Sequence, residues 1–239
     1  MNINTVIIRT ALSAMLLLSI LSVNAKQDAE QRELIIAHGA TMIPDESLKE
    51  WVSFADVVAV VTIINETQHA IDATTKKNGE GLVGRTVHAR IDEIAWAPED
   101  GTSVREGDVL DVSVFGWSLK HGKLIPITGS NSPRIEVDGT YIMPLAQFER
   151  GWGPITPQSV IPVNDSSIAR KDADRIRAKS PVAKRVKGKS IAKLRKMLNK
   201  ERVDEVAARN RHLRPNDRAK MVMKARRLRH QTQSNDRNK

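Results

Sequence analysis

Cysteine is absent from this sequence of 239 residues, and aromatic residues make up only 3% of it. The absence of cysteine excludes disulfides, thiolate zinc sites, cysteine nucleophiles, thiol redox motifs and a lipoprotein anchor. The four Trp, three Phe and one Tyr all lie between Trp51 and Trp152. We therefore expect this segment to contain the core, with a domain boundary soon after it.

Long apolar runs are also missing, except near the N-terminus, where residues 11–21 (ALSAMLLLSIL) are apolar. Arg9 before this run, and Val23 and Ala25 after it, complete the pattern of a secretory signal peptide with cleavage after Ala25. The alternative is an uncleaved membrane anchor, which needs about 20 apolar residues. Because exported proteins without disulfides are commonest in bacteria, the sequence predicts a periplasmic or extracellular bacterial protein.

The two halves of the chain carry opposite charge. Residues 1–163 contain 13 Lys and Arg against 20 Asp and Glu, a net charge of −7. Residues 164–239 contain 25 Lys and Arg against 8 Asp and Glu, a net charge of +17, and the two values sum to the +10 of the whole chain. Such asymmetry is typical of a tail that interacts with a partner.

Turn residues divide the first half into short apolar segments. Residues 55–64 (ADVVAVVTII) form a near-continuous β-branched run, which is typical of a buried strand. Residues 87–93 and 109–117 alternate as half-buried strands do, and residues 140–145 and 155–163 add two more apolar stretches. About five short strands predict a mainly β fold, a small OB-like five-stranded Greek-key barrel. An immunoglobulin-like sandwich of about seven strands is the alternative.

Two further segments of the first half have different patterns. Asp45 or Ser47 can cap a short helix that runs through Trp51, with apolar side chains on one face. Residues 68–84 are polar and contain Lys-Lys-Asn-Gly. We expect them to form a long exposed loop.

The second half predicts a basic α-helical C-terminal extension. Ser190 can cap a helix that continues to about Arg209, and Asn216, after the break at Pro215, can cap a final helix. The chain from Gln231 onward is expected to be disordered. The predicted organisation is a signal peptide (1–25), an N-terminal lead-in (26–44), the OB-like domain (45–170), a basic linker and helix (171–200) and a basic helical tail (201–239).

Five stretches within residues 47–198 occur in a recurring order: ADVVAVVTI (55–63), VHARIDEIAW (87–96), EGDVLDVSVFGW (106–117), VDGTYIMPL (137–145) and GKSIAKLRKML (188–198). This order resembles that of exported bacterial proteins with an OB-like, netrin-module-like β-barrel. The resemblance implies an OB-like fold and names no activity. Netrin-type protease inhibitors depend on an N-terminal cysteine and disulfides, so their mechanism is not implied for this chain.

Motifs associated with catalysis match only in part. Residues 183–190 (AKRVKGKS) resemble a phosphate loop, but the preceding segment is too charged for the buried strand that such a loop follows. An S-x-x-K spacing within the same segment lacks the accompanying S-D-N and K-T-G motifs. A zinc site would need His69, His88 and His121 to converge with a carboxylate. The sequence therefore predicts no catalytic residue, cofactor or metal, and leaves open a hydrolase or metalloenzyme whose residues converge only in three dimensions.

The basic tail is the part best suited to bind a partner, with salt-sensitive affinity for phosphates or carboxylates. No aromatic residue follows Trp152 and no helix-turn-helix or finger spacing occurs, which argues against sequence-specific nucleic-acid recognition. The lead prediction is an exported non-enzymatic β-barrel module that binds an envelope or extracellular component. The alternatives for the tail are binding to an anionic envelope polymer or membrane surface, docking to an acidic protein face, and a solvated tail without a partner. The predicted polyanion-binding residues are Arg209, Arg211, Arg214, Lys220, Lys224, Arg226, Arg227 and Arg229.

Overall fold

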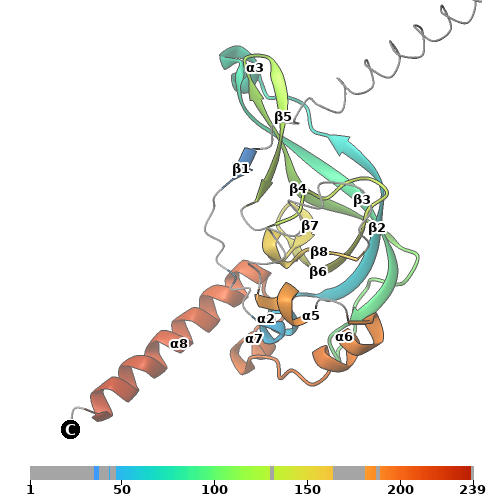
Figure 1. Cartoon of the computed structure of the whole chain (residues 1–239). Helices are drawn as coiled ribbons and strands as arrows, with labels where there is room; N and C mark the ends of the chain where they lie inside the picture. The colour runs from blue at the N-terminus through green and yellow to red at the C-terminus, as the bar shows by residue number, and fades with distance from the viewer. Residues whose placement is uncertain are drawn as a thin grey trace, which may run out of the picture. The chain divides into compact units, whose positions relative to one another are not determined.

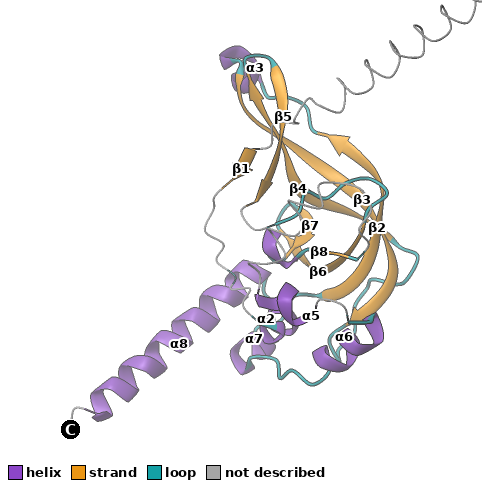
Figure 2. Ribbon diagram, viewed as in Figure 1, coloured by secondary structure: helices purple, strands orange, loops and turns teal. Residues whose placement is uncertain are grey.

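Among the described residues, those up to Val163 lie mostly in strands and those after it lie mostly in helices (Figure 1, Figure 2). The computed structural model describes residues 35–37, 43, 47–129, 132–163, 181–186 and 189–237. The strands are β1 (Ile35–Ala37), β2 (Val57–Gln68), β3 (Glu80–Trp96), β4 (Val109–Lys120), β5 (Lys123–Gly129), β6 (Thr140–Phe148), β7 (Gly151–Pro154) and β8 (Ile161–Pro162).

Two helices lie within the strand-rich part, and the others form what we call the C-terminal helical layer, α5 to α8. A single 3-10 turn, η1 (Pro157–Ser159), precedes β8. The helices are α2 (Leu48–Phe54), α3 (Ala73–Asn78), α5 (Pro181–Val186), α6 (Ile191–Leu198), α7 (Glu205–Arg209) and α8 (Pro215–Arg237).

The strands form one mixed sheet in the order β1-β5-β4-β3-β2-β6-β7, and β8 pairs with β6. Strand β7 also meets β4, but only at the residue pair Val112 and Trp152. Beyond that pair, the carbonyls of Phe115 and Gly116 on β4 accept hydrogen bonds from arginine side chains. The sheet therefore does not close into a barrel. The predicted mainly β fold with additional helices is confirmed, whereas the predicted five-stranded barrel is not closed.

The β-branched run of β2 is buried because the strand faces apolar clusters on both sides. Val58 and Val60 belong to one cluster, while Val57, Val61 and Ile63 belong to the other. Within the sheet, β2 pairs with β3 on one side and with β6 on the other. A strand covered on both faces has a continuous apolar sequence instead of an alternating one.

The C-terminal helical layer packs on the first of these clusters together with α2. Leu194 and Leu198 of α6 are 1% and 0% exposed, and Val222 of α8 is 1% exposed. They share the cluster with Trp51 of α2 and with Val58 of β2. The leucines lie four residues apart and so on one face of α6, which makes this face part of the core.

Several predicted elements differ from those observed. Residues 68–84, predicted as a loop, contain α3 and the start of β3, and Gly79 ends α3 with a left-handed φ of 67°. The predicted helix from Ser190 to Arg209 is interrupted after α6, because the side chain of Asp204 caps a separate helix, α7. Helix α8 begins at Pro215, so Asn216 lies inside its first turn and does not cap it.

Contacts place the described residues, from Ile35 onward, in one compact unit. The domain boundaries predicted inside this unit stay predictions. The predicted signal peptide and its cleavage after Ala25 lie outside the described residues. Helix α8 continues to Arg237, beyond Gln231, where the sequence predicts the ordered chain to end. In the described part of the chain, no helix combines the length and apolarity that crossing a bilayer requires.

Candidate functional site

Arginines connect the C-terminal helical layer to acidic side chains of the strand-rich part, residues 47–163, which we call the body. The arginines come from α6 and α8 and from the segment between α7 and α8. Part of the charge asymmetry in the sequence is therefore satisfied inside the molecule. The ion pairs, with their N–O distances, are Arg195–Glu93 (2.8 Å), Arg214–Glu149 (3.4 Å), Arg218–Asp56 (2.7 Å) and Arg226–Glu50 (3.8 Å).

Arg218, with 1% of its side chain exposed, is the most buried member of this set. Its Nη2 donates to the carbonyl of Phe54 at 3.0 Å and to Asp56 Oδ1 at 2.7 Å, while Nε and Nη1 have no hydrogen-bond partner among the described residues. Arg211 donates to two further carbonyls at the end of α2 and lies over the Trp96 ring. Burial, and then the charge of Arg218, lower the pKa of Arg211. Cations at the carboxyl end of a helix also interact favourably with its dipole.

The predicted polyanion-binding residues fall into two groups. In one group, the cation already contacts a carboxylate or a backbone carbonyl: Arg209, Arg211, Arg214, Lys220 and Arg226. In the other group, the side chain is exposed and forms no ion pair within the described part of the chain: Lys224, Arg227 and Arg229. Of the first group, Arg211, Arg214 and Arg226 contact the body, whereas Arg209 and Lys220 are exposed and pair with an acid of their own helix.

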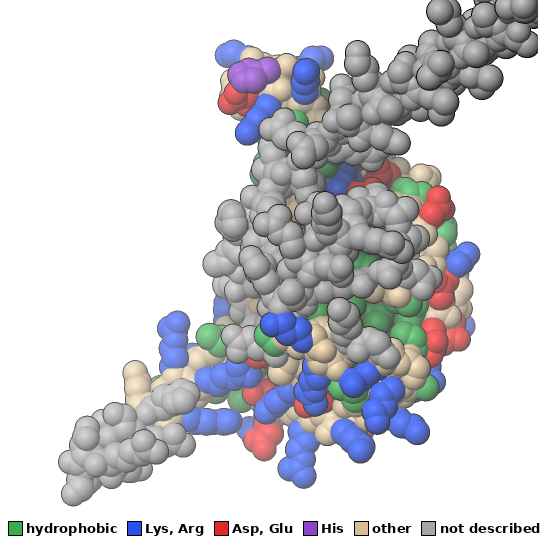
Figure 3. Space-filling view, in the orientation of Figure 1, with side chains coloured by type: hydrophobic (Ala, Val, Ile, Leu, Met, Phe, Trp, Pro, Cys, Tyr) green, Lys and Arg blue, Asp and Glu red, His purple; other side chains and the backbone are tan. Residues whose placement is uncertain are grey.

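Helix α6 presents lysines that the sequence prediction did not include. Lys193 and Lys196, with Lys200 just after the helix, have i, i+3, i+7 spacing on the side opposite to Leu194 and Leu198. Figure 3 shows Lys and Arg side chains gathered over the side of the molecule formed by the C-terminal helices. We call the exposed cations of this region that form no ion pair among the described residues the basic face: Lys184, Lys189, Lys193, Lys196, Lys200, Arg202, Lys224, Arg227 and Arg229.

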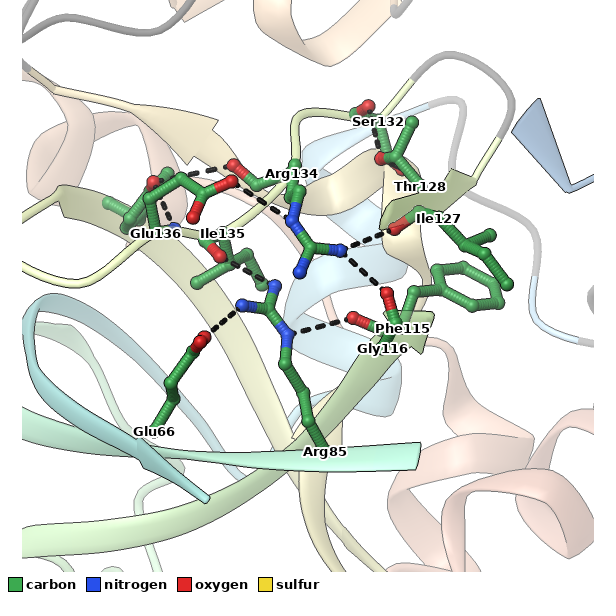
Figure 4. A network of polar contacts seen from close by, with 11 residues as sticks. Glu66, Arg85, Phe115, Gly116, Ile127, Thr128, Ser132, Arg134, Ile135 and Glu136 are labelled. Carbon is green, nitrogen blue, oxygen red and sulfur yellow. Dashed lines mark hydrogen bonds and ion pairs between the residues drawn. The ribbon is translucent and has the colours of Figure 1, made fainter. Parts of the chain in front are cut away.

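A second arginine cluster lies inside the body (Figure 4). Arg85 of β3 is 1% exposed and forms an ion pair with Glu66. Its Nε donates to the Phe115 carbonyl at 2.9 Å, and its Nη2 donates to the Ile135 carbonyl at 2.5 Å. The guanidinium carbon lies 5.7 Å from the centre of the Trp117 ring. Arg85 therefore joins β2, β3, β4 and the segment before β6.

Arg134 lies beside Arg85 (Figure 4), and its guanidinium carbon lies 5.2 Å from the centre of the same Trp117 ring. Its Nη1 donates to the carbonyls of Gly116 at 2.7 Å and Ile127 at 2.9 Å, and its Nε lies 3.0 Å from Glu136 Oε1. Burial, and then the nearby charge of Arg85, lower the pKa of Arg134, while Glu136 opposes the shift. The two arginines thus donate hydrogen bonds to four backbone carbonyls, those of Phe115, Gly116, Ile127 and Ile135.

A cavity of about 350 Å³ adjoins this cluster at the opening between β4 and β7. Residues 113–115 of β4 line one side, and residues 151–154, which form β7, line the other. Arg85, Arg134 and Arg150 contribute to the lining, and most of the remaining wall is apolar. A mostly apolar cavity with a few polar groups is the usual form of a small-ligand site.

The histidines singled out in the sequence converge only in part. His88 places Nδ1 2.7 Å from Asp111 Oδ1 and Nε2 3.0 Å from Thr67 Oγ1, and His69 contacts a threonine of β3. These contacts link neighbouring strands on an exposed face, and neither His69 nor His88 lines the cavity. His121 lies in the β4–β5 turn. In the described residues, no group of three or more His, Cys, Asp or Glu side chains could hold a metal ion.

No family model, curated protein or solved structure matches the chain. The basic face and the arginine-lined cavity are the two features of the described residues that bear on function. The structure does not support a phosphate loop at residues 183–190. Residues 181–186 form α5, where such a loop needs a buried strand. The Ser190 side chain is the N-cap of α6 and accepts a hydrogen bond from the backbone N–H of Lys193.

Arg85, Arg134 and Arg218 were missed by sequence reasoning. A signal for Arg85 was present, because it shares the inward phase of β3 with Val83 and Val87. Arg218 likewise lies four residues before the buried Val222 on α8. A cation in phase with an apolar stripe indicates a buried ion pair or hydrogen-bond network. No local pattern marks Arg134, which lies in the segment between β5 and β6.

Proposed function

We propose that this protein is an exported, non-enzymatic binding module that attaches through its basic face to an anionic polymer of the cell envelope or extracellular space. One observation carries the proposal. The cations that contact the body are arginines, whereas most of those on the basic face are lysines without an acidic partner among the described residues. The arrangement separates charges that hold the helices from charges that remain available.

The fixed position of α6 favours binding. Its apolar side is part of the core, and Arg195 on the same helix is paired with Glu93 of β3. The lysines therefore do not need the helix to fold on the partner, and the cost of ordering the chain on binding is reduced. Only the lysine side chains lose freedom when they contact the polymer.

A soluble or wall-bound polymer fits this face better than insertion into a bilayer. A helix that inserts at a membrane surface needs an apolar side directed to the lipid, often with aromatic anchors. In α6 that side is occupied by the core, and no aromatic residue follows Trp152 in the sequence. The attraction is then electrostatic and depends strongly on salt.

The fold proposed for the body is an open OB-like module made of β2, β3, β4, β6 and β7. Support comes from the pairings: β2, β3 and β4 are successive antiparallel neighbours, β6 pairs on the other side of β2, and β7 extends from β6 to one contact with β4. Strands β1 and β5 extend one edge. Support for export is the N-terminal apolar run followed by small residues.

Binding to heparin, a sulfated polymer, measured across a salt series tests the proposal. The variant K193Q/K196Q/K200Q removes three cations from the basic face, and K76Q/K77Q/K123Q removes three exposed lysines from α3 and β5. For duplex DNA, each neutralised charge contributes about 0.9 to the slope of log K against log salt. The first variant should therefore lower the magnitude of this slope by about two to three, and the second should leave it unchanged.

Equal losses in the two variants would show that heparin responds to net charge alone and would contradict a defined face. Equal binding of the wild type to heparin and to anionic phosphatidylglycerol vesicles, with the vesicle binding insensitive to salt, would support a membrane partner instead. Deletion of residues 201–239 is not a suitable test, because it removes Ala207, Ala219 and Val222 from the core.

A further inference from the structure

The cavity beside the arginine cluster lies where the sheet fails to close. Strand β4 contacts β7 at Val112 and pairs with β5 from Trp117 onward. Between these two points, its residues 113–115 face the cavity. The site is therefore a consequence of the strand arrangement and lies in the body, apart from the basic face.

The charge that lines the cavity has one sign. Three arginines contribute to the lining, and none of the described Asp and Glu residues does. Arg85 and Arg134 are paired with Glu66 and Glu136, which are not among the lining residues. Arg150 differs from both, because it is exposed and forms no ion pair within the described part of the chain. It leaves one positive charge for a ligand to neutralise.

The remaining walls favour an apolar occupant. They include the aromatic rings of Phe115, Phe148 and Trp152 and the side chains of Ile127 and Val160. The volume of about 350 Å³ lies at the lower end of the range for small-ligand sites, which is about 300–1,000 Å³. One unpaired cation at an apolar cavity matches a ligand with a single negative charge and a hydrocarbon body.

We infer that this cavity binds a small amphipathic monocarboxylate, with its hydrocarbon part against the aromatic walls and its carboxylate at Arg150. The site is independent of polymer binding, since Arg150 lies on the segment between β6 and β7 and belongs to the body. A straight-chain fatty acid and an aryl-substituted carboxylic acid share this chemistry. Among the described residues of the lining, the arginines are the charged ones and the other walls are mainly aromatic and aliphatic. A neutral alcohol, which has no carboxylate to pair with Arg150, should therefore bind more weakly than the acid.

Decanoate and 3-phenylpropionate are the probes, each titrated below its aggregation limit, with decanol as the neutral analogue. Calorimetry gives affinity and stoichiometry, and the fluorescence of Trp152, which lines the cavity, reports on position. One-to-one saturation by at least one acid is expected, with loss of the fluorescence change in W152F. Comparison of the two acids distinguishes a lipid-derived ligand from an aromatic one.

Two variants test the two parts of the site. R150Q should weaken binding of the acid about tenfold, the effect of a lost charge-assisted hydrogen bond, and should change decanol binding less than about twofold. R105Q removes an exposed cation that does not line the cavity and should leave both ligands unaffected. G153V adds a side chain inside the opening, where a Cβ on Gly153 would lie 3.4 Å from the Phe148 ring and 3.7 Å from the Ser113 carbonyl, and should abolish binding.

The inference is overturned if neither acid saturates, if R150Q binds the acid as the wild type does, or if a folded G153V retains binding. Circular dichroism establishes whether G153V is folded. If G153V does not fold, R150Q provides the test, because the Arg150 side chain is exposed. Heparin binding is also measured for R150Q and G153V. Loss of acid binding with unchanged heparin binding in these variants separates this site from the proposed function.

Discussion

Removal of Asp56 should destabilise the protein more than removal of Arg218, its ion-pair partner. The guanidinium of Arg218 is 1% exposed, whereas the carboxylate of Asp56 is 29% exposed. In the variant R218M, water can reach the carboxylate that is left behind. In the variant D56A, the guanidinium stays buried with the Phe54 carbonyl as its one remaining described acceptor.

The structure sets the size of this difference. Breaking a buried ion pair by removing one partner costs about 3–5 kcal/mol, and exposure of the partner left behind reduces that cost. We expect about 3–5 kcal/mol for D56A and about 1–3 kcal/mol for R218M. D56A also removes the acceptor for the backbone N–H of Gln147, at 2.8 Å. For a domain of this size, each kcal/mol lowers the Tm by about 2–4 °C.

Urea unfolding of both single variants and of D56A/R218M measures these values as a double-mutant cycle. The double variant should cost more than R218M only by the lost acceptor of the Gln147 N–H, because no guanidinium then remains buried without its carboxylate, and the coupling energy should be about 2 kcal/mol or more. The reasoning is refuted if D56A costs less than R218M, or if the two effects add within about 0.5 kcal/mol.

Two further predictions concern the body and the helical layer. Tyr141 is the sole tyrosine, and burial first, then the charge of Glu136, raise its pKa above the usual value of about 10. Absorbance at 295 nm should therefore rise with a midpoint above pH 10 in the folded protein and near pH 10 in urea. The contribution of Tyr141 to stability is then complete below about pH 10 and is lost as the pH rises through the folded-state pKa. A midpoint at or below pH 10 in the folded protein would contradict the prediction. Leu198 is 0% exposed in the core between α6 and α2, so L198A should lower the free energy of unfolding by about 2–5 kcal/mol. Met221 on α8 is 44% exposed, so M221A should change this free energy by less than about 0.5 kcal/mol. Similar small effects of the two variants would show that α6 does not pack on the body.

Local patterns predicted the central strands well, because burial and strand period act on neighbouring residues. The β-branched run at 55–64 became β2, and the turn at Gly107, with φ of 91°, precedes β4 as its sequence indicates. Ser47, one of the two predicted caps, is the N-cap of α2, and its backbone N–H donates to Glu50. In each case, one short segment contains the whole signal.

Other strands were not predicted. Strand β5 follows β4 after a two-residue turn, but Pro126 and the exposed Leu124 obscure its strand pattern. Strand β1 has only three residues and pairs with β5. The opening between β4 and β7, and the cavity in it, follow from strand positions that no local sequence pattern records.

Charge counting predicted a basic second half but not how its charge is divided. Arg218 and Arg195 point to acids far away in the sequence, Asp56 and Glu93, so their structural role depends on the fold. Lys193 and Lys196 have no such partner among the described residues. Only the structure separates the cations that contact the body from those that are exposed and form no ion pair among the described residues.

Chemical reactivity of individual lysines tests the proposed function most directly. The protein is acetylated briefly with and without saturating heparin, and mass spectrometry measures modification at each lysine. Our account predicts protection of Lys193, Lys196 and Lys200, with unchanged modification of Lys76, Lys77 and Lys123. Uniform protection of all six, or protection restricted to α3 and β5, would contradict a binding face on the C-terminal helices.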